Sequence, residues 1–140
     1  MKFRDFFSVK HILFAVCVLA LFVAFAFIAS YTQVEVTFEA DAVHVDSNRY
    51  TMSIPYEMIQ STELRDLPEA GEKLRNGRDD ETIRYGFWEN DTWGKHHIIA
   101  DLEAKNCIVI RTQSGEVFVF SCRDTEKTEE LYTTLLEHLN

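Results

Sequence analysis

An uninterrupted apolar segment, residues 12–29, constrains the fold of this chain more than any other feature. All 18 of its side chains are apolar, and no charged residue follows until Glu35. A helix of this length rises roughly 27 Å, close to the thickness of the hydrocarbon core of a bilayer. Ser30 and Tyr31 extend it to a span over 12–31, with Tyr31 at the interface. We therefore expect one transmembrane helix, and a cleaved signal peptide is the alternative.

The charges that flank this segment predict its orientation. Residues 1–11 contain three basic side chains and one acid, whereas the chain that follows is acidic up to Arg49. The positive-inside rule then places residues 1–11 in the cytoplasm as a short tail and residues 34–140 outside as one domain. We expect a single-pass protein of the cell membrane whose C-terminal domain is extracytoplasmic and whose contact with lipid is through 12–31.

The net charge excludes one large class of partner. The 140-residue chain carries a formal net charge of -9, and because residues 1–11 contribute +2, the remainder carries -11. Binding to nucleic acid needs clustered Lys and Arg that neutralise phosphates, so no nucleic-acid partner is expected. An apolar fraction of 46% excludes a disordered chain, and three Cys exclude a disulfide-dense scaffold.

Short runs of alternating apolar and polar residues predict strands after residue 34. Strands are expected at 34–39, 43–46, 50–54, 56–64, 82–88, 97–100, 107–112 and 117–122. Turns are expected at 66–71, at Asn76-Gly77 and at 89–91. Within the fourth run, residues 57–59 alternatively make one helical turn.

The end of the chain has a different period. Asp124 or Thr125 is suited to cap a helix, and Leu131, Leu135 and Leu139 recur every four residues. This predicts one amphipathic helix of about four turns. The fold class that follows is mainly β: an antiparallel sandwich or partly open barrel of about seven strands, capped by a C-terminal α-helix and preceded by one N-terminal transmembrane helix.

The order of these elements resembles the bacterial pleckstrin-homology (PH-like) domain family. The residues that carry the resemblance are Ile54-Pro55-Tyr56-Glu57-Met58-Ile59, Ser61-Thr62-Glu63-Leu64, Pro68, Gly71, Asn76-Gly77, Arg84-Tyr85-Gly86-Phe87, Trp93-Gly94, and the hairpin from Cys107-Ile108-Val109-Ile110 through Ser114-Gly115-Glu116 to Phe118-Val119-Phe120-Ser121. The resemblance covers 34–140 and implies two packed sheets with a terminal helix over one open end. It also implies a membrane-anchored member, since many proteins of this family are joined to transmembrane segments.

Phosphoinositide binding is not expected despite this resemblance. The eukaryotic relatives bind the headgroup with Lys and Arg around the first hairpin. Here that region contains Glu39, Asp41 and Asp46, and no basic residue occurs before Arg49. A cluster of phosphates requires several convergent Lys or Arg side chains, which this hairpin does not offer.

Two Trp and two His lie close together in the sequence and are the densest group of candidate binding residues. With a nearby Arg, the tentative binding residues are Arg84, Trp88, Trp93, His96 and His97. Two Trp at the mouth of a sandwich suit a peptide or glycan groove. In the alternative, Phe87 and Trp88 straddle one strand and Trp93 packs under its own loop. Arg84 belongs to a basic cluster diluted by acids, which suits either a salt-bridged surface or a small anion site.

No pattern in the chain predicts catalysis or a bound metal. Adjacent residues on a strand point to opposite faces, so His96 and His97 do not easily bind one ion, and no third ligand follows at a fixed spacing. Ser114-Gly115 is a hairpin turn rather than a nucleophile elbow, and phosphate-binding loops are absent. We therefore expect no enzyme, no catalytic residues, no metal site and no cofactor.

The hairpin register decides the state of two cysteines. With a two-residue turn, Cys107 faces Cys122 and a disulfide is possible. With a three-residue loop and Gly115 left-handed, Cys107 faces Ser121 and the two Cys point to opposite faces. The second register separates large apolar side chains from mixed ones more cleanly, so it is favoured, and with it free buried thiols rather than a Cys107–Cys122 bond.

These features favour a membrane-tethered, non-enzymatic interaction module that binds a protein, peptide or envelope component. The alternative is an accessory subunit of a larger membrane protein that acts through its transmembrane helix. Ala20 and Ala24 lie four residues apart in that helix, a spacing that permits close helix packing.

The predicted topology can be tested with a cysteine introduced near Asn76-Gly77. A membrane-impermeant thiol reagent should label it in intact cells, because the domain is expected outside the membrane. Labelling that occurs only after permeabilisation would contradict this orientation.

Overall fold

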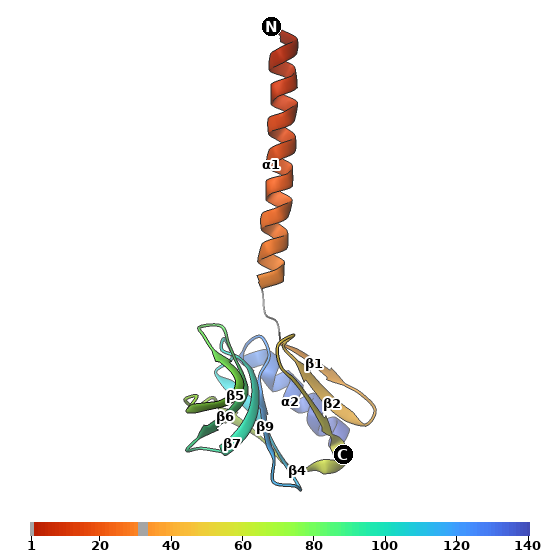
Figure 1. Cartoon of the computed structure of the whole chain (residues 1–140). Coiled ribbons are helices and arrows are strands. Elements are labelled where there is room, and N and C mark those ends of the chain that lie inside the picture. Colours follow the sequence, from red (N-terminus) through yellow and green to blue (C-terminus); the bar gives the residue numbers. More distant parts are fainter. Residues whose placement is uncertain (1, 31–33) are drawn as a thin grey trace. The chain divides into compact units, whose positions relative to one another are not determined.

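The computed structural model describes the backbone of residues 2–30 and 34–140 and the side chains of 8–27 and 34–140. The chain divides into two compact units. The first is helix α1 (Lys2–Ser30), in which Ser8–Phe27 is long and apolar enough to cross a membrane (Figure 1). The side chains of 8–27 are exposed on every side of the helix, as expected for a segment surrounded by lipid. The expected span 12–31 falls on α1, except that Tyr31 lies outside the described residues.

The second unit is built from short strands followed by one helix. Its elements are β1 (Glu35–Phe38), β2 (Ala42–Asp46), β3 (Thr51–Pro55), the 3-10 turn η1 (Tyr56–Met58), β4 (Ile59–Asp66), β5 (Glu72–Asp79), β6 (Ile83–Asn90), β7 (Gly94–Asp101), β8 (Asn106–Thr112), β9 (Val117–Phe120) and α2 (Thr125–Leu139). The predicted fold class is therefore confirmed: mainly β, in two sheets, with a C-terminal helix and an apolar N-terminal helix.

The strands form a three-stranded and a six-stranded sheet. Their orders are β1-β2-β3 and β4-β8-β9-β7-β6-β5. In Figure 1, β1 and β2 lie on one side of the domain and β5, β6 and β7 on the other. All neighbours are antiparallel except β7 and β9, which are parallel. This pair departs from the expected all-antiparallel sheet because β9 folds back from β8 and inserts between β8 and β7.

The predicted turn at Asn76-Gly77 is wrong, because both residues lie inside β5. They occupy a part of the strand where the pairing with β6 shifts register, as β-bulges do. Asn76 has a φ of 48°, and Gly86 on β6 has a φ of 120°. A Cβ on Gly86 would lie 2.5 Å from the Cα of Gly77, so the glycines allow the two backbones to approach. A dipeptide that is typical of turns is therefore found here at a register shift between two strands.

The run expected at 56–64 combines both structures that were considered for it. Residues Tyr56–Met58 form the 3-10 turn η1, and the strand β4 begins at Ile59. Pro55 precedes the turn with φ -62° and ψ 134°, an extended conformation that it reaches without strain. The bend at η1 carries the chain from the three-stranded sheet into the six-stranded sheet.

The register predicted for the β8–β9 hairpin is confirmed. Ile108 pairs with Phe120 and Ile110 with Phe118, which places Cys107 opposite Ser121. The amide of Gly115 donates to the carbonyl of Thr112 at 3.0 Å, and Gly115 has a φ of 88°. The hairpin therefore closes through the three-residue loop 113–115 with its glycine in the left-handed region.

The alternation that follows from this register divides the interior of the domain in two. The first core cluster lies between the two sheets and α2 and contains Val34, Val43, Val45, Met52, Ile54, Ile83, Ile99, Ile108, Ile110, Phe120, Cys122, Leu131 and Leu135. The second core cluster lies on the other face of the six-stranded sheet and contains Trp88, Trp93, Ile98, Ala100, Cys107, Val109, Val117 and Val119.

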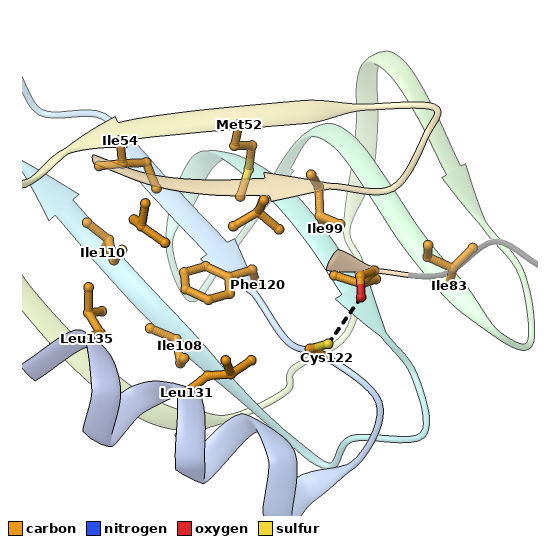
Figure 2. Packing of buried hydrophobic residues seen from close by; sticks show 13 residues of the cluster. Met52, Ile54, Ile83, Ile99, Ile108, Ile110, Phe120, Cys122, Leu131 and Leu135 are labelled. Carbon is orange, nitrogen blue, oxygen red and sulfur yellow. Dashed lines mark hydrogen bonds between the residues drawn. The ribbon is translucent and has the colours of Figure 1, made fainter. Parts of the chain in front are cut away.

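Phe120 occupies the centre of the first core cluster. Figure 2 shows its ring between the strand that carries Met52 and Ile54 and the helix that carries Leu131 and Leu135. Because its side chain is fully buried, it links the two sheets and α2 through one set of apolar contacts.

The segment 67–71, here called the crossing loop, connects the two edge strands of the six-stranded sheet, β4 and β5. Leu67 and Ala70 pack against the second core cluster. The amide of Leu67 donates to the carbonyl of Lys105 at 3.0 Å, and the guanidinium of Arg84 donates to the carbonyl of Pro68 at 2.9 Å. These two bonds fix the first two residues of the crossing loop.

Helix α2 begins at the cap predicted for it. The carboxylate of Asp124 accepts a hydrogen bond from the amide of Lys127 at 2.8 Å. Thr128 is buried, and its hydroxyl contacts the backbone of both Asp124 and Cys122. The start of the helix is therefore attached to the segment between β9 and α2.

Two adjacent leucines of α2 test the packing of this helix. Leu135 is fully buried, whereas Leu136 is 36% exposed. Leu135→Ala should lower the free energy of unfolding by about 3 kcal/mol, because it leaves a cavity in the first core cluster. Leu136→Ala should change it by less than about 0.5 kcal/mol. Urea unfolding followed by Trp fluorescence measures both, and equal losses in the two variants would contradict the packing described.

Candidate functional site

The six-stranded sheet separates the candidate binding residues that the sequence suggested. Trp88, Trp93 and His96 lie on the side of the second core cluster, whereas His97 lies on the side of the first. His96 and His97 are adjacent on β7, so their opposite directions follow from the period of a strand. The five candidate residues therefore do not form one site.

Trp88 and Trp93 are packing residues in this structure. Their side chains are only 6% and 8% exposed. The Trp88 indole nitrogen donates to the carbonyl of Tyr85 at 2.9 Å, and Trp93 meets the ring of His96 edge-on with centroids 5.2 Å apart. Both aromatic rings thus fill the second core cluster, as the alternative interpretation of them predicted, rather than lining an open groove.

His96 is a buried imidazole with one partner. It is 1% exposed, and its Nδ1 lies 2.8 Å from the carbonyl oxygen of Gly94. Its Nε2 is buried and has no hydrogen-bond partner among the described residues. Burial lowers the pKa of His96; the Gly94 carbonyl opposes this effect and the nearby charge of Arg84 adds to it.

His97 joins the two sheets through an aromatic stack. Its Nδ1 lies 2.6 Å from the hydroxyl of Tyr50, which belongs to the connection between β2 and β3. Its ring stacks on Phe118 at 5.0 Å and lies 4.8 Å from Phe87. Burial lowers the pKa of His97, Glu116 opposes this effect, and Arg75 adds to it.

Arg84 is a buried cation that holds the crossing loop. The residue is 9% exposed, its Nε donates to the carboxylate of Asp79 at 3.2 Å, and its Nη1 donates to the carbonyl of Pro68 at 2.9 Å. An ion pair fixed by further hydrogen bonds compensates the desolvation of the guanidinium. Arg84 lies in a cleft described below, and it belongs to neither aromatic group.

Cys107 and Cys122 are free and lie in different core clusters. Burial raises the pKa of the Cys107 thiol to about 12, and burial also raises the pKa of Cys122. The Cys122 thiol donates to the carbonyl of Val34 at 3.1 Å, the bond drawn as a dashed line in Figure 2. The register of the hairpin, which turns the two thiols to opposite faces of the sheet, agrees with the absence of a bond between them.

An acidic cleft opens between the crossing loop and the turn that joins β6 to β7. Its volume is about 860 Å³. It is lined by Pro68, Glu69, Gly71, Glu72, Glu89, Asn90, Asp91, Thr92 and Gly94. Four of the lining residues are acidic and none is basic, so the cleft favours a positively charged occupant.

Two of these carboxylates lie directly opposite each other. Glu72 on β5 pairs with Glu89 on β6 in the register of the sheet. Lys95 pairs with Glu89 from the other side, on β7, yet no ion pair forms between them. Among the described residues, none of the four cleft carboxylates has an ion-pair partner. Like charges opposite each other on neighbouring strands destabilise a sheet.

The acidic cleft is preformed by hydrogen bonds along its rim. The side chain of Asn90 donates to the carbonyl of Glu69 at 3.3 Å and accepts from the amide of Trp93 at 2.8 Å. Gly71 has a φ of 84°, and a Cβ there would lie 2.1 Å from the carbonyl oxygen of Glu89. A ligand therefore meets walls already held in place, and the entropy lost on binding is small.

The acidic residues of the cleft do not point to one position, as the ligands of a metal ion do. Within the described residues, no three His, Cys, Asp or Glu side chains are placed to hold one metal ion. The acidic residues of the cleft instead come from the crossing loop, β5, β6 and the turn after β6, an arrangement that suits a cation with several charges along its length.

The acidic cleft was not predicted from the sequence. Three of its acids, Glu69, Glu89 and Asp91, lie in the turns expected at 66–71 and 89–91, and Glu72 directly follows the first of them. Only the pairing of β5 with β6 brings Glu72 next to Glu89, and β5 was itself not predicted. The one available signal was the number of acids in these two turns, which is also typical of solvated loops.

The chain matches no protein-family model, no curated protein and no solved structure.

The buried imidazole of His96 and the half-buried imidazole of His97 predict a stability that depends on pH. Both have folded-state pKa values below the unfolded value of about 6.5, so the folded chain binds fewer protons. Stability should be fully present above about pH 6.5 and fall as the pH drops through the folded pKa values. Urea unfolding of the full chain in neutral detergent, between about pH 7.5 and about pH 5.5, measures this loss.

One variant serves as the control for this pH dependence. His97→Gln removes one titrating group and should reduce the slope. A free energy of unfolding that stays constant over this pH range would contradict the prediction.

Proposed function

We propose that this chain is a membrane-tethered, non-enzymatic interaction module, anchored by α1 with its C-terminal domain outside the membrane. We further propose that the domain is PH-like and binds a positively charged segment of a partner protein in the acidic cleft. The observation that carries this proposal is the unpaired Glu72–Glu89 pair within a preformed cleft.

The like-charge pair lowers the stability of the domain, and nothing in the fold requires two acids at these positions. Carboxylates directly opposite each other on neighbouring strands lower stability by about 0.2–1 kcal/mol. Sequences depart from such local rules mainly at functional sites, where a ligand compensates the loss. A Lys or Arg side chain placed between Glu72 and Glu89 replaces this repulsion with attraction.

The tether supports a role in interaction. Helix α1 ends at Ser30 and β1 begins at Glu35, so the segment between the apolar helix and the domain is short. A short tether raises the effective concentration of the domain for any partner in the same bilayer. A modest affinity in the cleft then suffices for association.

An accessory subunit that acts through α1 is the second candidate function. It is favoured by the exposed apolar surface on every side of Ser8–Phe27, which offers a partner helix any face. Replacing Ser8–Phe27 with a Leu/Ala helix of the same length separates the two functions. Capture of a membrane partner from a mild detergent extract should persist if the domain carries the interaction and disappear if α1 carries it.

The double variant Glu72→Gln/Glu89→Gln tests the acidic cleft. It should raise the free energy of unfolding by roughly 0.2–1 kcal/mol, because it removes the repulsion. It should also weaken binding of a trilysine peptide with blocked termini roughly fivefold, since two charge contacts are worth about 1 kcal/mol together. Titration calorimetry at low salt and urea unfolding of the full chain in neutral detergent give the two readouts.

The matched control is Glu57→Gln/Glu137→Gln, which removes the same charge from exposed positions outside the acidic cleft. It should retain the affinity of the original chain. The proposal is wrong if both double variants weaken peptide binding equally, since net charge alone would then explain it, or if the original chain does not bind the peptide.

A further inference from the structure

A second cleft lies on the other side of the crossing loop and contains the buried Arg84. Its volume is about 520 Å³. It is lined by Leu67, Pro68, Glu69, Ala70, Gly71, Asp79, Arg84, Leu102, Ala104 and Lys105. Because Pro68, Glu69 and Gly71 line both clefts, one ligand can occupy the two together.

The guanidinium of Arg84 has donors that the protein does not use. Nε donates to Asp79 and one Nη1 proton to the carbonyl of Pro68, which leaves Nη2 and the second Nη1 proton. Among the described residues, the buried side-chain atoms without a partner are His96 Nε2 and Asn106 Oδ1. Arg84 Nη2 is not one of them, so solvent reaches it.

This geometry suits a planar oxyanion. Nη1 and Nη2 form a fork that matches the two oxygens of a carboxylate, and charge-assisted pairs of this kind are among the strongest hydrogen bonds in proteins. Asp79 and the Pro68 carbonyl hold the fork in one orientation, so a ligand does not have to order it.

Lys105 provides a second positive charge in the same cleft. Its amide donates to the hydroxyl of Thr125 at 3.0 Å, which fixes its backbone against the start of α2. Its side chain is exposed and has no ion-pair partner among the described residues. An anion bound to Arg84 can therefore also meet the exposed ammonium group of Lys105.

The acids of the second cleft limit the charge that it accepts. Asp79 is paired with Arg84, and Glu69 lies on the crossing loop between the two clefts. Two acids and two bases make this cleft neutral as a whole. It therefore suits a single negative charge directed at the fork better than a doubly charged phosphate.

We propose that Arg84 and Lys105 form a carboxylate-binding subsite that recognises the free carboxyl terminus of a polypeptide whose basic side chains lie in the acidic cleft. This inference rests on the proposed function. It adds that the partner presents a chain end rather than an internal segment. The crossing loop then separates the part of the ligand that carries negative charge from the part that carries positive charge.

A pair of peptides that differ only at the carboxyl terminus tests the subsite. Acetylated trilysine with a free carboxylate should bind the full chain, in neutral detergent at low salt, roughly threefold to tenfold more tightly than its carboxyl amide. Lys105→Gln should remove most of this preference while the affinity for the amide stays within twofold of the original. Arg49→Gln, which removes a charge from the exposed β2–β3 connection, should retain the preference.

A second variant guards against a loss of folding. Arg84→Lys keeps the charge but loses the fork. It should lower the preference for the free acid in a protein that still unfolds cooperatively. Lys105→Gln changes an exposed side chain, so it tests the subsite without disturbing the buried contacts of Arg84 with Asp79 and Pro68. A preference for the free acid that survives in both variants would overturn the assignment.

Three other outcomes also decide the matter. Equal binding of the acid and the amide would overturn the carboxylate subsite and leave the proposed function standing. Failure of both peptides to bind would overturn the proposed function, and the subsite with it. If inorganic phosphate abolishes the preference at a concentration where acetate does not, the subsite recognises phosphate and the carboxylate assignment is wrong.

Discussion

The rest of the domain depends on the apolar packing of strand β9 against both core clusters. Its side chains alternate, so that Phe118 and Phe120 face one side of the six-stranded sheet and Val117 and Val119 face the other. A central strand with both faces covered must be apolar throughout. By inserting between β8 and β7, β9 joins both core clusters, and the two sheets and α2 are assembled around it.

Much of this arrangement was predictable because it depends on local patterns. The hairpin register followed from the partition of Ile108 and Phe120 from Val109 and Val119, and the helix α2 followed from leucines four residues apart. The opposite directions of His96 and His97 followed from the two-residue period of a strand. In each case the physical determinant lies within a few residues of its effect.

The parts that sequence reasoning missed depend on distant residues. Asn76-Gly77 is typical of a turn, yet the approach of Gly86 makes it part of an irregular strand pair. The acidic cleft exists because β5 pairs with β6 and the crossing loop joins opposite edges of one sheet. Local propensity carries no information on such pairing, and the same acids are equally compatible with a solvated loop. The two clefts that we propose as binding sites thus arise from topology.

The contact between Cys122 and Val34 has a mechanical consequence. Val34 is buried and precedes β1, which has four residues and a single neighbouring strand. Any tension that reaches the domain along the chain from α1 is therefore applied to the shortest edge of the three-stranded sheet. Neither cleft is lined by residues of β1, so β1 can yield under force while the binding surfaces keep their shape.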